Sequence, residues 1–238
     1  MPIRISLGRA EAAHPPSQIS AIFKEGDTGL YYAKLHHKKR HTHDSVKTLF
    51  VLLNNHEPGN KARTLRLQKL MYRLAKAFAL SLQETRHLLL FAKMHNIGLL
   101  GIPHRIIIKH GLLKKGEHVL LRKQADIGYR IAMNTPQLQP IADWVHTQHE
   151  WWNGQGYPFG LSGTDIPFQS RMMAIVRAYS AMTSPRPYQS QRSRDEALSQ
   201  LSAWAGIQFD PEMVQSFIAL IKEGSQKGQV NGNKMHDS

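Results

Sequence analysis

The side chains best suited to chemistry in this sequence are two histidines, His95 and His149, each beside a residue with a side-chain amide. Asn96 follows the first and Gln148 precedes the second. Neutral imidazoles are common ligands of Zn, Fe and Mn, and a bound metal ion lets water act as a nucleophile near neutral pH. The 238 residues include no cysteine, so any metal would have to sit on His, Asp and Glu.

The elements that position these residues read as helices separated by breaks rich in Gly and Pro. Ser81 and Glu84 have the spacing of a capping box, which predicts that the helix carrying His95 starts there. Residues 150–167 form a long break with four Gly, two Pro and two Trp. The pattern predicts an all-α fold of about 7–8 helices, which include, besides the helix carrying His95, residues 65–78, 117–133, 137–149, 168–183, 194–205 and 211–222.

Four segments, in chain order, also carry a family resemblance. They are His95-Asn96-Ile97-Gly98 with Gly101-Ile102-Pro103, then Gln124-Ala125-Asp126-Ile127-Gly128, then the run from Gln148 to Pro158, and finally Arg177 to Ser184 with Arg186-Pro187-Tyr188. They resemble the H-D-I-G-K…G-I-P, H-P-E-I-G, H-H-E-x-x-D-G-x-G-Y-P and D-x-F-D-A-L-T-S-x-R-P-Y motifs of the HD-GYP family. The resemblance spans roughly residues 45–222.

This resemblance implies a helical, metal-dependent phosphodiesterase that opens the bacterial second messenger cyclic di-GMP. Two neutral imidazoles cannot balance several divalent cations, and an arginine adds a permanent positive charge. We therefore expect a degenerate, inactive site; the alternatives are a weakly held Fe, Mn or Zn ion and residual hydrolysis. Relative to the family pattern, His95 and His149 are retained ligands, whereas Asn96, Gln124, Gln148 and Arg177 replace ligands, Asn153 replaces the Asp before Gly154, and Leu99 replaces a lysine.

The retained parts of the motif suggest recognition in place of catalysis. Arg186 lies in a segment that is near the nucleotide phosphates in the family, and an arginine offers a rigid two-pronged donor for phosphate. Together with Arg177 it could hold cyclic di-GMP, with Trp151, Trp152 or Tyr157 stacked on a guanine and Gly156 in the signature loop. The other candidate ligand is a GGDEF domain or another signalling protein, because this loop docks such domains in some family members.

Two plainer interpretations stay open at this stage. His95 could be a hydrogen-bonded core histidine, and Arg177 could extend to solvent. The sequence does not determine which way Arg177 points.

Residues 1–42 resemble a different family. The alternating segment 3–8 predicts a short strand and residues 19–39 a helix, and Ala21 to Lys34 resembles the last helix of a GGDEF domain. The rest of that domain is absent, so we interpret 1–42 as a strand-helix remnant or the result of a truncated start. An unpaired strand edge would favour a homodimer. The predicted organisation is therefore a remnant at 1–42, a degenerate HD-GYP domain at 43–222, and a disordered tail at 223–238.

Composition adds a third functional reading. Lys and Arg outnumber Asp and Glu by 31 to 17, for a net charge of +14, and such a field attracts polyanions. A basic nucleic-acid-binding module is therefore an alternative, although no nucleic-acid-binding motif supports it. The absence of cysteine, of an apolar stretch long enough for a bilayer and of a secretory signal predicts a cytoplasmic protein without a membrane partner.

Overall fold

The protein is described from a computed structural model that covers residues 45–109, 111–184 and 191–233, with side chains up to residue 223. The predicted N-terminal strand and helix lie outside the described residues, and so does Arg186. Contacts along the chain separate Met1–Thr48 from Leu49–Ser238, and the description below concerns the second unit.

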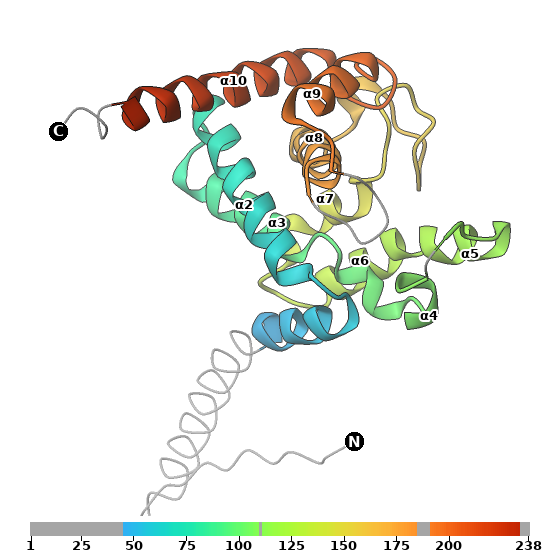
Figure 1. Cartoon of the computed structure of the whole chain (residues 1–238). Coiled ribbons are helices and arrows are strands. Elements are labelled where there is room, and N and C mark those ends of the chain that lie inside the picture. Colours follow the sequence, from blue (N-terminus) through green and yellow to red (C-terminus); the bar gives the residue numbers. More distant parts are fainter. Residues whose placement is uncertain (1–44, 110, 185–190, 234–238) are drawn as a thin grey trace, which may run out of the picture. The chain divides into compact units, whose positions relative to one another are not determined.

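The first part of this unit is a helical hairpin (Figure 1). Residues 49–56 are helical, and α2 (Asn60–Ala77) begins after Gly59, whose φ of 74° suits a glycine. α3 (Leu82–Met94) starts at Ser81, where Ser81 and Glu84 form both bonds of the predicted capping box. α2 and α3 pack closely against each other through apolar side chains that recur every three or four residues, including Leu67, Leu70, Met71, Leu74, Leu88 and Phe91.

The middle of the chain folds over the end of α3. It contains η2 (Ile97–Gly101), α4 (His104–Ile107), α5 (Lys115–Arg122) and α6 (Gln124–Met133). The sequence predicted one helix over 117–133, but the structure divides it at Lys123, whose N–H bonds to the carbonyls of Leu120 and Leu121. The division lets α6 pack directly on η2.

The remaining elements complete the helical layer around α2 and α3. η3 (Gln139–Ile141) and α7 (Ala142–Thr147) lead into the long loop, which contains η4 (Gly163–Asp165). α8 (Phe168–Met182), α9 (Arg194–Ala203) and α10 (Pro211–Asn233) follow, and α8 packs against α2, α7, α9 and α10. The all-α prediction is confirmed for the described residues, where only isolated β-bridges occur. The tail was predicted to be disordered from residue 223, but α10 continues as a helix to Asn233.

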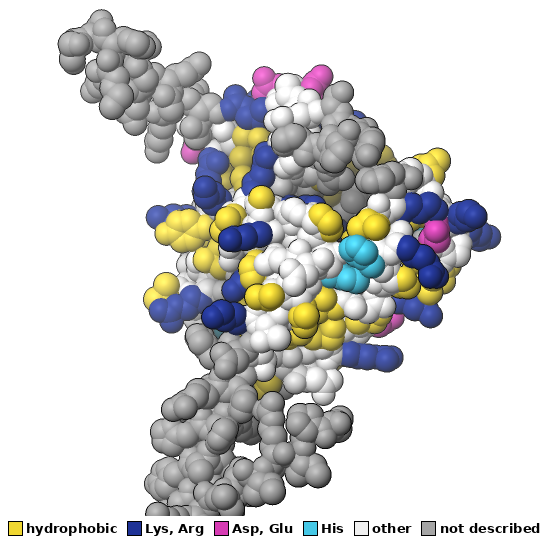
Figure 2. All heavy atoms as spheres, turned by 60° about the horizontal axis from the view of Figure 1, so that its bottom comes forward, with side chains coloured by type: hydrophobic (Ala, Val, Ile, Leu, Met, Phe, Trp, Pro, Cys, Tyr) yellow, Lys and Arg dark blue, Asp and Glu magenta, His cyan; other side chains and the backbone are white. Residues whose placement is uncertain are grey.

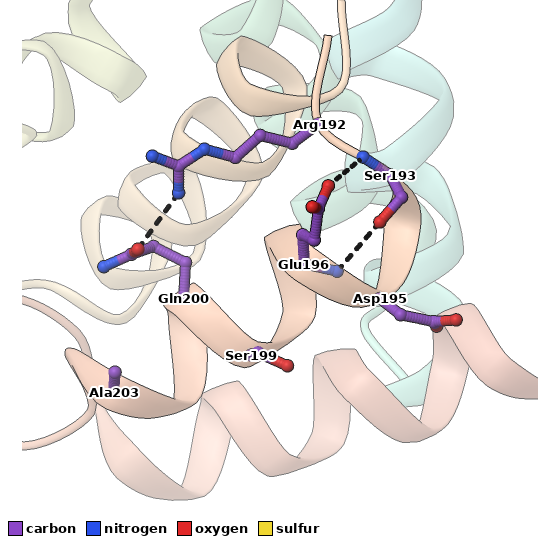
Figure 3. Close-up of a pocket in the computed structure, with 7 residues that line it drawn as sticks. All are labelled: Arg192, Ser193, Asp195, Glu196, Ser199, Gln200 and Ala203. Atoms are coloured by element: carbon purple, nitrogen blue, oxygen red, sulfur yellow. Dashed lines mark hydrogen bonds between the residues drawn. The ribbon is translucent and has the colours of Figure 1, made fainter.

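The surface of this unit is mixed in character. Lys and Arg side chains alternate with hydrophobic ones over much of the face shown in Figure 2. Two hollows, of about 650 and 200 Å³, lie along α9, and the larger is lined by polar residues such as Arg192, Glu196 and Gln200 (Figure 3). Neither hollow includes the retained histidines. Among the described residues, no helix combines the length and apolar character that a membrane crossing requires.

Candidate functional site

His95 lies at the C-terminal end of α3, where its side chain is buried. Its Nδ1 lies 3.0 Å from the carbonyl oxygen of Ala92. Because a carbonyl only accepts, Nδ1 must carry the proton and Nε2 the lone pair. Burial, reinforced by the positive charge of Arg177, lowers the pKa of His95 to about 3, so the imidazole is neutral at physiological pH.

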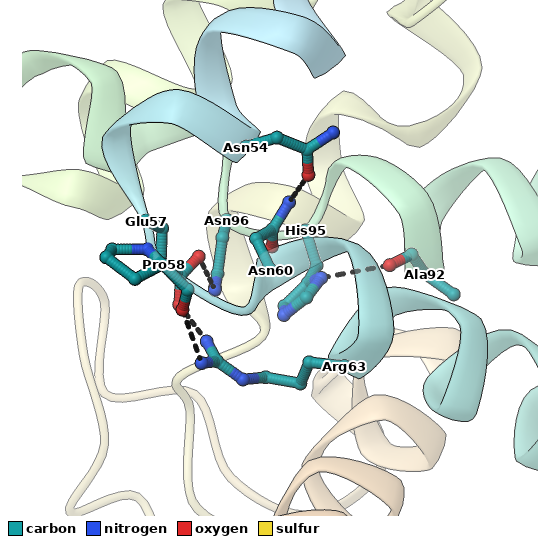
Figure 4. Close-up of polar contacts among 8 residues, drawn as sticks. All are labelled: Asn54, Glu57, Pro58, Asn60, Arg63, Ala92, His95 and Asn96. Carbon is teal, nitrogen blue, oxygen red and sulfur yellow. Dashed lines mark hydrogen bonds and ion pairs between the residues drawn. The ribbon is translucent and has the colours of Figure 1, made fainter.

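Asn96 is held in a polar network with residues of the turn before α2 (Figure 4). Its side-chain amide donates to one carboxylate oxygen of Glu57 at 3.0 Å. The other oxygen of Glu57 accepts a hydrogen bond and ion pair from Arg63. Glu57 is itself buried, so its charge is matched locally by a cation and an amide.

Gln148 connects the end of α7 to His95. Its amide nitrogen donates to the carbonyl oxygen of His95 at 2.6 Å and to that of Val145 at 3.1 Å, and the side chain is buried. Its amide oxygen accepts from Arg177 at 3.2 Å. All the hydrogen-bonding groups of this side chain are therefore directed at protein atoms, and Gln148 acts as a bridge between α3 and α8.

Arg177 points inward from α8, which answers the question that the sequence left open. Its Nη1 lies 3.3 Å from Nδ1 of His149 as well as close to Gln148. A guanidinium only donates, so Nδ1 of His149 must accept and Nε2 must carry the proton. That Nε2 is buried and has no hydrogen-bond partner among the described residues.

The electrostatics of His149 follow from this contact. Burial, together with the positive charge of Arg177, lowers the pKa of His149 well below its usual value. Burial also lowers the pKa of Arg177, while Tyr157 and Glu57 act in the opposite direction. Arginine nevertheless keeps its proton in proteins, so the site contains two neutral imidazoles and one cation.

Tyr157 extends this group toward the surface. Its ring stacks on that of His149, with centroids 4.8 Å apart and planes inclined by 7°. Its hydroxyl accepts from Gln124 at 3.2 Å, and the guanidinium of the exposed Arg122 lies 5.1 Å from its ring centroid. The structure thus brings Gln124, Gln148, His149, Tyr157 and Arg177 together in one cluster, which we call the Arg177 cluster.

The loop that follows is built around Glu150. This side chain is buried, and its carboxylate accepts from the backbone N–H groups of Phe159 and Leu161 at 2.7 and 3.1 Å. A Cβ on Gly156 would lie 2.2 Å from the backbone nitrogen of Trp151, so glycine is required there for packing. The ring of Trp151 lies edge-on to that of Trp204, with centroids 5.9 Å apart.

The last motif segment is anchored to α2. Arg66 donates to the hydroxyl of Thr183 at 2.6 Å and to that of Ser184 at 3.0 Å. These contacts position the chain immediately before residue 185, where the described residues are interrupted. The role predicted for Arg186 therefore stays a prediction.

The residues present do not fit the metal centre that the resemblance implies. No group of three or more His, Asp or Glu side chains in the described part of the chain could hold a metal ion. Asn96 and Gln148 direct their amides at protein partners. Moreover, the proton on Nε2 and the Arg177 bond at Nδ1 leave His149 without a free lone pair, and the cation at that position would repel a metal ion.

Comparisons with known proteins identify the class of this chain. A profile of the HD domain matches residues 47–213. A cyclic di-GMP phosphodiesterase of Thermotoga maritima is 35% identical over 185 residues, which are 74% of this chain and 50% of that protein. The cyclic di-GMP phosphodiesterase response regulator RpfG of Xanthomonas campestris is 28% identical over 202 residues, 84% of this chain and 53% of that protein.

A solved structure supports the fold. A cyclic GMP-AMP specific phosphodiesterase of Vibrio cholerae superposes with a TM-score of 0.53 at 20% identity, over 75% of this chain and 47% of that chain. The protein belongs to the HD-domain family. It spans about half the length of the two curated relatives compared above.

Sequence reasoning missed three residues of the site. They are Glu57 and Arg63, which contact each other beside Asn96, and Arg122, which lies over the ring of Tyr157; the sequence analysis singled out none of them. A signal for Glu57 existed, because an acid within the Gly- and Pro-containing break at 54–60 had no obvious helical role. Nothing in the local sequence showed that this turn would face Asn96.

Proposed function

We propose that this chain is a degenerate HD-GYP module that binds without metal and does not hydrolyse. The observation that carries the proposal is the contact between Arg177 and Nδ1 of His149, which places a fixed cation among residues that match family ligand positions. Asn96 and Gln148 support it because each uses its amide in a protein hydrogen bond. Residues 1–42, outside the described part, belong to the same proposal as a remnant of a GGDEF domain.

The proposed ligand is a cyclic dinucleotide, of which cyclic di-GMP is the first candidate. The Arg177 guanidinium has donors beyond those used on Gln148 and His149, and charged hydrogen bonds to phosphate are strong. Arg122 adds a second, exposed cation above the ring of Tyr157. Relatives in Vibrio cholerae are named for either cyclic di-GMP or 3'3'-cGAMP, so both nucleotides are to be tested.

The test compares binding and turnover in the same preparation. We expect calorimetry to show nucleotide binding that persists with EDTA, and no linear dinucleotide product after incubation with Mn²⁺ or Fe²⁺. Arg177→Ala should weaken binding by about tenfold or more, the usual cost of a lost charged hydrogen bond. The matched control is Arg130→Ala, an exposed arginine on α6, which should bind like the parent chain.

Two results would contradict the proposal. Near-stoichiometric bound metal with turnover would show a working phosphodiesterase. Equal nucleotide affinity in the parent chain and in a folded Arg177→Ala variant, verified by its melting curve, would remove Arg177 from recognition.

A protein partner such as a GGDEF domain is the second candidate. The observation that favours it is Phe159, whose side chain is 59% exposed on the signature loop. Its ring lies edge-on to that of His146, and the His146 ring in turn stacks on that of Tyr129, with centroids 4.4 Å apart. If no nucleotide binds, binding of a purified GGDEF domain should be measured, and Phe159→Ser should then weaken it.

A further inference from the structure

The segment containing α4 and α5 has an unusual combination of anchoring and exposure. We call residues 104–109 and 111–123 the arm. Its inner side is fixed, because Leu113 and Leu121 pack against a buried cluster that includes Ile102 and Ile106. Figure 1 shows α4 and α5 at the end of the unit away from α10. The arm is thus held by one side and free on the other.

The free side of the arm carries aliphatic residues. Leu112 is 94% exposed, and Val119 is 57% exposed. Ile108 and Leu120 are also exposed. Moving any of these apolar side chains out of water would lower the free energy of the system. The described part of the chain contains nothing that covers them, so the arm presents an apolar tip to its surroundings.

The exposed charged side chains of the arm are all cations. Its exposed cations are Arg105, Lys114, Lys115, Arg122 and Lys123. Its one acid, Glu117, is used internally: it pairs with Lys109 and accepts from the backbone N–H of Lys114, which caps α5. Figure 2 shows basic and hydrophobic side chains gathered at its right-hand side, where Figure 1 places this arm.

From this arrangement we infer that the arm docks the protein on an anionic lipid surface. A basic helix with an exposed apolar face binds at the membrane interface, with its apolar side chains in the headgroup region and its cations on acidic lipids. Nucleic acid fits less well, because the arm has no Phe, Tyr or Trp to stack on bases and phosphates offer nothing to Leu112. The inference goes beyond the proposed function and needs neither nucleotide nor metal.

The absence of cysteine from the sequence makes a direct test possible. Leu112→Cys gives a single site for an environment-sensitive dye in the full chain. With vesicles of phosphatidylcholine containing about one third phosphatidylglycerol, we expect a blue shift of the dye and flotation of the protein. Pure phosphatidylcholine vesicles should produce neither effect, and high salt should reverse both.

Matched variants separate the arm from general charge. Leu82→Cys places the dye on a comparably exposed leucine of α3 and should show no shift. The double variant Lys114→Glu/Lys115→Glu should weaken vesicle binding by about tenfold or more. Lys69→Glu/Arg86→Glu, with the same change in net charge at exposed sites on α2 and α3, should retain most of it. Melting curves establish that each variant is folded.

Several results would overturn the inference. These are failure to float with anionic vesicles, equal binding to neutral vesicles, or an equal loss of binding in the two charge-reversal variants. Binding to duplex DNA without binding to vesicles would reassign the arm to nucleic acid. A change from dimer to monomer on Leu112→Asp would show that a second copy covers the tip. All these measurements are made with EDTA and without nucleotide. Their outcome therefore does not depend on whether the chain binds a cyclic dinucleotide.

Discussion

The guanidinium of Arg177 and Nδ1 of His149 lie 3.3 Å apart, so one of the two retained histidines is engaged by a cation from α8. This contact also explains the state of the neighbouring side chains. Gln148 supplies its oxygen to the same guanidinium, and Tyr157 covers the face of the imidazole. These motif residues thus form a connected cluster around the Arg177 guanidinium.

Replacing Arg177 with an acid should create a metal site. In Arg177→Asp the bond to Nδ1 of His149 is lost, and a carboxylate joins the imidazoles of His95 and His149. We expect near-stoichiometric Zn²⁺ after desalting, measured by elemental analysis, against background levels in the parent chain. Arg177→Leu removes the cation without adding a ligand and should bind little. Zinc at stoichiometric levels in the parent chain would contradict this account.

Introducing an aspartate at Asn96, by contrast, should destabilise the fold. In Asn96→Asp, the donor to Glu57 becomes a second carboxylate about 3 Å from the first. We expect the free energy of unfolding at neutral pH, measured with urea, to fall by about 1–3 kcal/mol relative to the parent chain. This difference should shrink in acid, where the two neighbouring carboxylates share a proton.

A control for this variant exists in the same motif. Asn153 is exposed, and its side-chain oxygen accepts from the N–H of Gln155. An aspartate can accept the same bond, so Asn153→Asp should change stability little. Equal losses in the two variants would show that Glu57 is not the cause.

Much of the fold could be predicted from local sequence patterns. The capping box at Ser81 is confirmed, and α8 begins and ends within a residue of the predicted 168–183 helix. These features depend on neighbours in sequence, through helix hydrogen bonds and apolar periodicity. The division at Lys123 was missed because the apolar periodicity runs across it, and the contact of α6 with η2 that accompanies the division joins segments that no local pattern relates.

The candidate site was harder to predict for the same reason. Its residue types were visible, but the direction of Arg177 depends on Gln148, which lies on another helix. The partnership of Asn96 with Glu57 joins residues 39 positions apart. Trp151 shows the same limit: its edge-on contact with Trp204 joins residues 53 positions apart, and its predicted stacking on a guanine stays a prediction.

Acid should destabilise the protein through its two buried histidines. The pKa of His95 is lowered from 6.5 to about 3, and that of His149 is also lowered. Below pH 6.5 the histidines of the unfolded chain therefore bind more protons than those of the folded chain. The free energy of unfolding consequently falls as the pH drops from 6.5 toward 3. Each histidine contributes up to about 1.4 kcal/mol per pH unit.

Urea titrations at several pH values test this directly. The fall in unfolding free energy between about pH 7 and about pH 5 should be smaller in His95→Gln and His149→Gln than in the parent chain, whatever their stability at neutral pH. Identical pH slopes in all three proteins would mean that neither histidine is buried in its neutral form.

Two glycines predict opposite effects of the same substitution. A Cβ on Gly98 would lie 1.8 Å from the backbone carbonyl oxygen of Gln124, at the contact between η2 and α6, where neither backbone can retreat without separating the elements. Gly116, within the exposed α5, has open space at that position. Gly98→Ala should cost at least about 2 kcal/mol of unfolding free energy, whereas Gly116→Ala should add up to about 1 kcal/mol, because alanine favours the helix. Urea unfolding of both variants measures the difference, and a neutral Gly98→Ala would show that α6 does not lie on η2 as described.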